Sequence, residues 1–231
     1  MAAIDIFPVL AAEALYAIEQ GDFEKAYETF DTASYAHILG EFLPYYAFTA
    51  IKTGKTERIN RYLSEYFNNQ TGKPVVKDQQ IGIYKDASFN ARLAQAVIDA
   101  GNGDHAAAMT LLKSVNAAVE HTEERLVFTR YQIIETARLL YVHSGVEQYK
   151  QFALDLAQRN RVIEPIQTYS ASFVAMLSDD KSERVQALAL LLSLDPGSRS
   201  VINADPEELR EARNLPMTPV ISDSSGDDLG I

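Results

Sequence analysis

The stretch EQGDFEKAYETFDTA, residues 19–33, decides the fold that the sequence predicts. Gly21 ends one amphipathic segment, and the segment after it places Ala26, Phe30 and Ala33 on one helical face. Glycine commonly ends a helix because it adopts a left-handed conformation that costs other residues energy. We therefore expect two helices joined by a tight turn at Gly21, with Ala26 packed closely against the preceding helix.

The same arrangement recurs farther along the chain. Glycine interrupts apolar helical patterns in KTGKTERINRYLSEY (residues 52–66), GNGDHAAAMTLLKSV (101–115) and HSGVEQYKQFALDLA (143–157). Apolar or small side chains stand five, nine and twelve positions after each glycine, except that Lys150 takes the first of these positions in the last stretch. In the second of these stretches Ala108 holds that first position, and we also expect it to pack closely against the preceding helix.

A fifth pair of apolar segments, residues 165–177 and 181–194, is joined by a polar turn without a glycine. Helical spacing of apolar residues dominates the chain, and strict alternation is almost absent. The sequence therefore predicts an all-α protein with at least ten helices in consecutive antiparallel hairpins. The expected turns lie at Gly21, Gly54, Gly103, Gly145 and Ser178–Asp180.

The spacing of the first two glycines resembles a known repeat. Gly21 and Gly54 lie 33 residues apart, close to the roughly 34 residues of the tetratricopeptide repeat, a helix-turn-helix unit. Ala14 and Ala47 stand at the small-residue position of the first helix in two successive units, and Gly21-Asp22-Phe23 resembles the turn.

The chain also departs from that repeat. Leu10, Ala17 and Ile38 replace its large aromatic residue, its first-helix tyrosine and its closing proline. The resemblance is good over residues 6–68 and looser over 85–195. It implies a right-handed α-solenoid of about five antiparallel helical hairpins.

Three segments fall outside the repeated pattern. Residues 69–84 contain a short alternating run and predict an inserted loop or a small hairpin. Asp205 followed by Pro206 predicts a short helix, because aspartate is a common N-cap and proline suits the first helical position. Residues 214–231 are rich in serine, proline and aspartate and predict an irregular, flexible acidic tail. We expect one helical-repeat domain over residues 1–213, followed by this tail.

Composition excludes several classes of function. The 231 residues carry a net charge of −11, which disfavours binding to nucleic acid or to an anionic membrane surface. The absence of cysteine rules out disulfides and thiolate chemistry. The N-terminus lacks the basic residues of a secretory signal, and no apolar run reaches the length of a membrane span. These features predict a cytoplasmic protein without membrane insertion.

One short motif suggests a phosphate-binding loop. Gly54-Lys55-Thr56 matches the end of such a loop, but the pattern needs a glycine five residues earlier, where Thr49 stands within a helical run. Gly54 is therefore interpreted as a turn, and we expect no nucleoside triphosphate to bind.

The four histidines do not form a helical metal-binding pattern. His37, His105, His121 and His143 show neither HxxxH nor HExxH spacing, so no metal or other cofactor is expected. Because Glu135 and Arg138 precede His143 along one helical stretch, an unrecognised acid/base site made of these three residues is kept as a hypothesis.

The resemblance supplies candidates for partner binding, because the first helices of a repeat solenoid line its concave face. The candidates are Tyr45, Phe48 and Lys52 in the second unit, Asn90, Arg92 and Gln95 in the third, and Gln132, Glu135 and Arg138 in the fourth.

The leading hypothesis is a non-enzymatic scaffold or adaptor that binds another protein or a peptide along a helical groove, alone or within a larger assembly. A helical regulatory domain that senses a peptide or small ligand is the first alternative. An all-α enzyme is the second.

Overall fold

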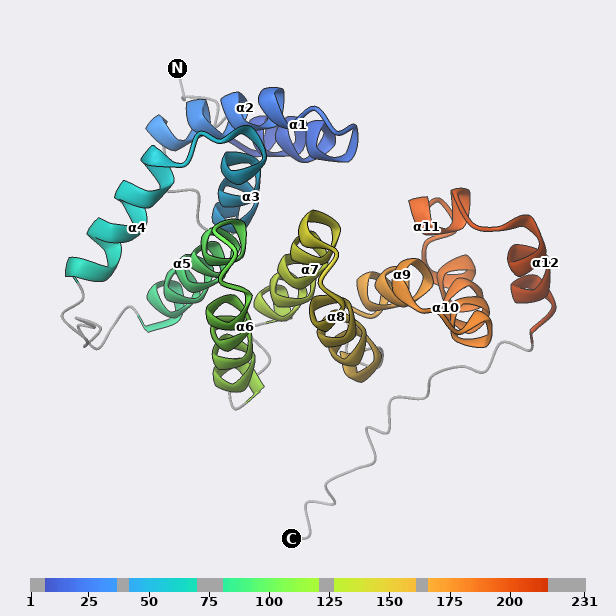
Figure 1. Ribbon diagram of the computed structural model, residues 1–231. Helices are drawn as coiled ribbons and strands as arrows, with labels where there is room; N and C mark the ends of the chain where they lie inside the picture. Colours follow the sequence, from blue (N-terminus) through green and yellow to red (C-terminus); the bar gives the residue numbers. More distant parts are fainter. Residues whose placement is uncertain (1–6, 37–41, 70–80, 121–126, 161–165, 216–231) are drawn as a thin grey trace, which may run out of the picture. The chain divides into compact units, whose positions relative to one another are not determined.

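The computed structural model describes residues 7–36, 42–69, 81–120, 127–160 and 166–215, and this part of the chain contains helices and no strands (Figure 1). The all-α prediction is confirmed, and the helices exceed the expected ten. The twelve helices of the described part are α1 (Phe7–Glu19), α2 (Phe23–Ala36), α3 (Leu43–Thr53), α4 (Glu57–Asn69), α5 (Ile81–Gly101), α6 (His105–Glu120), α7 (Val127–Ser144), α8 (Glu147–Asn160), α9 (Gln167–Leu177), α10 (Lys181–Leu194), α11 (Arg199–Ile202) and α12 (Pro206–Asn214).

The expected turns separate these helices. Gly21, Gly54, Gly103 and Gly145 all have φ between 68° and 88°, in the region that favours glycine. After three of them the next amide donates back to a carbonyl five residues earlier, from Asp22 to Ala17, Lys55 to Ala50 and Asp104 to Asp99, each at 2.9 Å. This bond is typical of a glycine-terminated helix, because it satisfies one of the last free carbonyl groups.

Aspartates then start several of the following helices. The carboxylate of Asp104 accepts from the amide of Ala107 at 2.9 Å, and that of Asp180 accepts from Ser182 at 2.7 Å. The predicted N-cap Asp205 accepts from the amides of Glu207 and Glu208. These bonds satisfy the free amides of a first helical turn, so the turn positions are specified by local chemistry.

The chain divides into two compact units, Met1–Tyr149 and Lys150–Ile231, with the boundary inside α8. The sequence predicted a single helical-repeat domain over residues 1–213 and gave no signal for this division. We call the two parts the N-terminal unit and the C-terminal unit and describe each separately.

In the N-terminal unit α5 is the central helix, since it packs against α3, α4, α6 and α7. Gly101 at its end permits a close approach to α3, because a Cβ atom there would lie 2.7 Å from Cγ2 of Ile51. Ala26 and Ala108, the small residues expected to pack closely, are fully buried. The hydroxyl of Tyr46 donates to Asp31 at 2.6 Å, and Arg58 pairs with the same carboxylate at 2.7 Å, which joins α2, α3 and α4.

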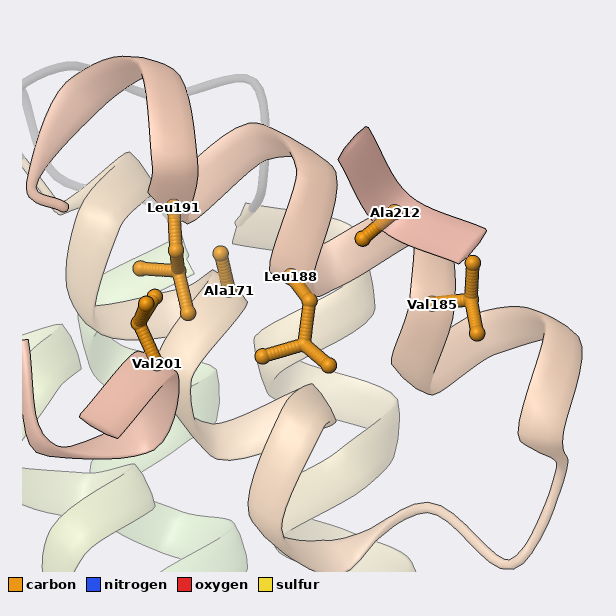
Figure 2. Close-up of a cluster of buried hydrophobic side chains, with 6 residues drawn as sticks. All are labelled: Ala171, Val185, Leu188, Leu191, Val201 and Ala212. Atoms are coloured by element: carbon orange, nitrogen blue, oxygen red, sulfur yellow. The ribbon is translucent and has the colours of Figure 1, made fainter. Parts of the chain in front are cut away.

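The C-terminal unit has its own apolar cluster. Figure 2 shows side chains from four helices, α9 to α12, meeting in this cluster. Its buried members are Ala171, Val185, Leu188, Leu191, Val201 and Ala212. The predicted short helix at Asp205 is therefore attached to the body through Ala212.

Lys150 explains the one exception in the repeated apolar pattern. It stands where the other stretches have an apolar or small residue, and only 7% of it is exposed. Its ammonium pairs with the carboxylate of Asp179 at 2.6 Å, and the side chain of Asp179 is largely in solvent. A lysine can occupy an apolar position in this way, because its stem is apolar while its charge reaches the surface.

Two predicted segments fall largely outside the described residues. Of the expected loop or hairpin at residues 69–84, Asn69 ends α4 and residues 81–84 belong to α5, so these five residues are helical and not strand or loop. Of the tail at 214–231, only Asn214 and Leu215 are described. None of the helices in the described part combines the length and the apolar character needed to cross a membrane.

Candidate functional site

The structure brings the candidate residues of α3 and α7 together in the N-terminal unit. The hydroxyls of Tyr45 on α3 and Tyr131 on α7 lie 3.4 Å apart. Arg138, also on α7, donates two hydrogen bonds of 2.7 Å to the carboxylate of Glu135. Burial raises the pKa of Tyr45 well above its ordinary value, and Glu135 raises it further. The tyrosine is therefore neutral, and the only formal charges in this group belong to the Glu135–Arg138 pair.

The pair is nearly enclosed. The side chain of Glu135 is 9% exposed and that of Arg138 is 25% exposed. Burial alone would lower the pKa of Arg138, but the adjacent Glu135 raises it above its ordinary value. Both carboxylate oxygens of Glu135 already accept from the guanidinium, so the pair fixes α7 internally.

A second group lies farther along the same two helices. Phe48 on α3 meets Phe23 edge to face, with ring centroids 5.8 Å apart, and meets the ring of His143 on α7 at 6.3 Å. The ammonium of Lys52 lies 5.5 Å from the centroids of both phenylalanine rings. Burial lowers the pKa of His143, and the positive charge of Lys52 lowers it further.

The candidates on α5 do not join either group through a hydrogen bond or an ion pair in the described part of the chain. Asn90 is buried, and its side-chain oxygen has no hydrogen-bond partner there. Gln95 donates to Asp99 one turn later on the same helix, at 2.7 Å. Arg92 is half-buried.

Burial separates the nine partner-binding candidates into two sets. Five of them are less than 9% exposed and contribute to the interior, so they do not offer a surface to a partner: Tyr45, Phe48, Asn90, Gln132 and Glu135. The other four are half-buried and keep part of their surface in solvent: Lys52, Arg92, Gln95 and Arg138.

The acid/base hypothesis placed Glu135, Arg138 and His143 in one site. The first two are in contact, but His143 makes neither a hydrogen bond nor an ion pair with Glu135 and packs instead against Phe48. Within the described residues, no group of three or more histidine, aspartate or glutamate side chains is arranged to hold a metal ion.

The exposed apolar surface lies elsewhere. Large apolar side chains that are at least half exposed occur on α1 (Val9 and Tyr16), α7 (Val142), α9 (Tyr169 and Met176) and α11 (Ile202). On α1 and on α9 the two residues are seven positions apart, which places them on one face. No candidate chosen from the repeat register is among them, although the seven-residue spacing is visible in the sequence.

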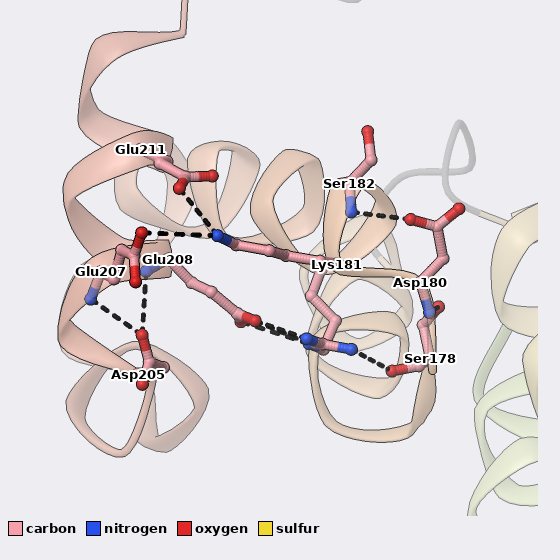
Figure 3. Close-up of polar contacts among 9 residues, drawn as sticks. Ser178, Asp180, Lys181, Ser182, Asp205, Glu207, Glu208 and Glu211 are labelled. Atoms are coloured by element: carbon pink, nitrogen blue, oxygen red, sulfur yellow. Dashed lines mark hydrogen bonds and ion pairs between the residues drawn. The ribbon is translucent and has the colours of Figure 1, made fainter.

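Polar contacts organise the surface of the C-terminal unit. Figure 3 shows Lys181 on α10 reaching the carboxylates of Glu207 and Glu211 on α12, at 3.7 and 2.8 Å. Arg184 on α10 donates to both carboxylate oxygens of Glu208 and to the carbonyl of Ser178. These bonds clamp α12 onto α10.

Beside this clamp lies an open depression of about 580 Å³ between α10 and α12. Val185 and Leu215 give it an apolar part, and Lys181, Ser182, Gln186, Glu211 and Asn214 complete its lining. The charged groups of that lining, Lys181 and Glu211, already pair with each other.

Comparison of the chain with protein-family models, with curated proteins and with solved structures returned no match.

Proposed function

We propose that this protein is a non-enzymatic scaffold or adaptor that binds a partner protein through its helices. One observation carries the proposal. In the described part of the chain, five of the six large apolar side chains that are at least half exposed lie on α1, α7 and α9, each the first helix of a pair predicted from the sequence. The second helices α2, α4, α6, α8 and α10 carry none among their described residues.

This distribution supports a binding role for a physical reason. An apolar side chain left in water loses the favourable free energy of burial, which is about 25 cal/mol per Å² of apolar surface. Tyr16 and Tyr169 are 57% and 50% exposed, and tyrosine is among the residues enriched in protein interfaces. The free energy of the system is therefore lowered when a partner covers a surface of this kind.

The arrangement is also the one that a tetratricopeptide-like α-solenoid would use. In such a solenoid the first helices face the concave side, and partners bind there. We therefore propose that the helical pairs form such a solenoid, and that partner contacts are made by the apolar residues of α1 and α7 in the N-terminal unit and, separately, by those of α9 in the C-terminal unit. The half-buried Lys52, on the first helix α3, would supply a polar contact.

The test is a capture experiment with matched variants. The wild-type chain, Tyr16→Ser, Tyr169→Ser and Ile202→Ser are used as baits in extract from the source cells, and bound proteins are quantified by mass spectrometry. Ile202 is the control, because it is 69% exposed but lies on α11, outside the predicted first helices.

We expect one partner at stoichiometric yield with the wild type, at least tenfold less with one of the tyrosine variants, and no change with Ile202→Ser. Melting temperatures should be equal for all four proteins, since the substituted side chains are exposed. The absence of a stoichiometric partner, or an equal yield from all four baits, would contradict the proposal.

A further inference from the structure

One face of α10, in the C-terminal unit, carries two basic and two apolar side chains. Lys181, Arg184, Val185 and Leu188 stand at positions i, i+3, i+4 and i+7, which is the spacing of a single helical face. We call these four residues the α10 stripe. Val185 and Leu188 are 6% and 2% exposed and belong to the apolar cluster of the unit (Figure 2). The α10 stripe is therefore basic at the start of the helix and apolar beyond it.

Helix α12 covers the α10 stripe with a complementary pattern. Its carboxylates meet the two basic residues: Lys181 pairs with Glu207 and Glu211 at 3.7 and 2.8 Å, and Arg184 donates to both oxygens of Glu208 (Figure 3). The methyl group of its buried alanine then joins the apolar half of the stripe in one cluster. The α10 stripe thus already binds an acidic amphipathic helix, and that helix is α12 itself.

The apolar part of this contact is small. Ala212 is the buried residue of α12, and Leu209 is half-buried. An open depression of about 580 Å³ remains between α10 and α12, with Val185 and Leu215 in its lining. The neighbour that α12 chiefly packs against is α10. Because partly exposed ion pairs each contribute little free energy, a helix that matches the stripe better can replace α12.

We propose that the α10 stripe is a docking site for an acidic amphipathic helix of a partner protein, and that α12 covers this site until such a helix replaces it. The partner helix carries carboxylates one turn apart, which meet Lys181 and Arg184. It also carries an apolar side chain long enough to fill the depression that α12 leaves open. The complementary charges fix the orientation of the helix and steer its approach. The site is independent of the exposed apolar residues of α1, α7 and α9, since it uses other side chains.

The test uses the full chain and a peptide with the sequence of residues 204–215, blocked at both ends. In the variant Glu208→Arg/Glu211→Arg the charges of α12 oppose those of α10, so α12 should leave the stripe while α10 stays unchanged. Binding is followed by NMR, from the amide signals of Val185 and Leu188 as the peptide is added. The matched control is the same peptide with glutamine in place of every glutamate, which keeps the size and removes those negative charges.

We expect the peptide to half-saturate the variant at about 1 mM or below. The short connection between α11 and α12, residues 203–205, holds α12 at an effective concentration of the order of millimolar, so a helix that stays docked there must bind the free stripe at least that tightly. The wild type should need about tenfold more peptide or still more, because α12 occupies its stripe and only the free fraction binds. The control peptide should shift neither amide signal in either protein.

Unshifted signals of Val185 and Leu188 in the variant, at about ten times the expected peptide concentration, would overturn the proposal. Unchanged α12 signals in the variant would also overturn it, because α12 would then not be held by its charges. Equal half-saturation of the wild type and the variant would show that α12 does not cover the site. Equal binding of the control peptide would show that the stripe does not select an acidic helix.

Discussion

Replacing Arg138 by methionine tests how the interior between α3 and α7 is held together. The change leaves the carboxylate of Glu135, with a side chain only 9% exposed, without the two hydrogen bonds of 2.7 Å that it now accepts. Removing one member of a fully buried ion pair costs about 3–5 kcal/mol. Because a quarter of the Arg138 side chain is exposed, water can reach part of the vacated space, and we expect a loss of about 2–4 kcal/mol.

A second substitution should reverse most of that loss. In Glu135→Leu/Arg138→Met the buried charge is gone, and replacing a buried pair by apolar residues of similar size is often neutral. We expect the double variant to lie within about 1 kcal/mol of the wild type. Arg210→Met is the matched control, because Arg210 is exposed on α12, and its loss should change stability by less than about 0.5 kcal/mol.

The assay is urea denaturation followed by circular dichroism at neutral pH, with the free energy of unfolding extrapolated to water for all four proteins. The reasoning fails if Arg138→Met unfolds together with the wild type. It also fails if the double variant is as unstable as the single one, because the cost would then come from packing and not from an unpaired carboxylate.

Four further outcomes follow from the described contacts. Leu188→Ala, in the apolar cluster of the C-terminal unit, should lower the free energy of unfolding by about 2–5 kcal/mol in urea denaturation, because the side chain is 2% exposed. Ala108→Leu should cost about 1–3 kcal/mol in the same assay, since Ala108 is fully buried and has no room for three more carbons. The pKa of His143 is lowered in the folded chain, so the unfolded chain binds a proton first as the pH falls below about 6.5. The stability of the wild type should therefore decrease below that pH, and it should decrease less in His143→Gln. Thermal melts of both proteins in chloride buffer, above and below about pH 6.5, measure this difference. Lys55→Ala should leave the melting temperature nearly unchanged, since its ion pair with Glu24 is exposed, and calorimetry should detect no ATP binding to either protein.

Local chemistry explains why the helices and turns could be predicted. A glycine with positive φ, such as Gly54, and a capping aspartate, such as Asp104, act within a few residues, so their effect is visible in a short window of sequence. The buried face of a second helix is likewise visible as a spacing, and Ala26, Phe30 and Ala33 are all buried as expected. These features can be recognised in the sequence without knowing which helices pack against each other.

The candidate site depends on long-range packing, and the sequence did not determine it. Tyr45 and Phe48 are aromatic residues of the kind found in binding surfaces. However, α3 is covered by α2, α5 and α7, and both side chains are buried as a result. The division within α8 is equally invisible in a repeated pattern, because Lys150 begins the second unit without any break in the helix.

Apolar side chains are exposed on α1 but buried on α3, because the two helices differ in the number of helices that pack against them. Both are first helices by the repeat register, but α1 packs chiefly against α2, through Ala11, Ala14 and Ala17. Because α1 is apolar around most of its circumference, the face away from α2 leaves Val9 and Tyr16 in solvent. A repeat register assigns equivalent positions the same role, whereas exposure here differs from one first helix to the next. Residues for partner-binding experiments therefore have to be chosen by exposure, because five of the nine side chains that the register selects are buried.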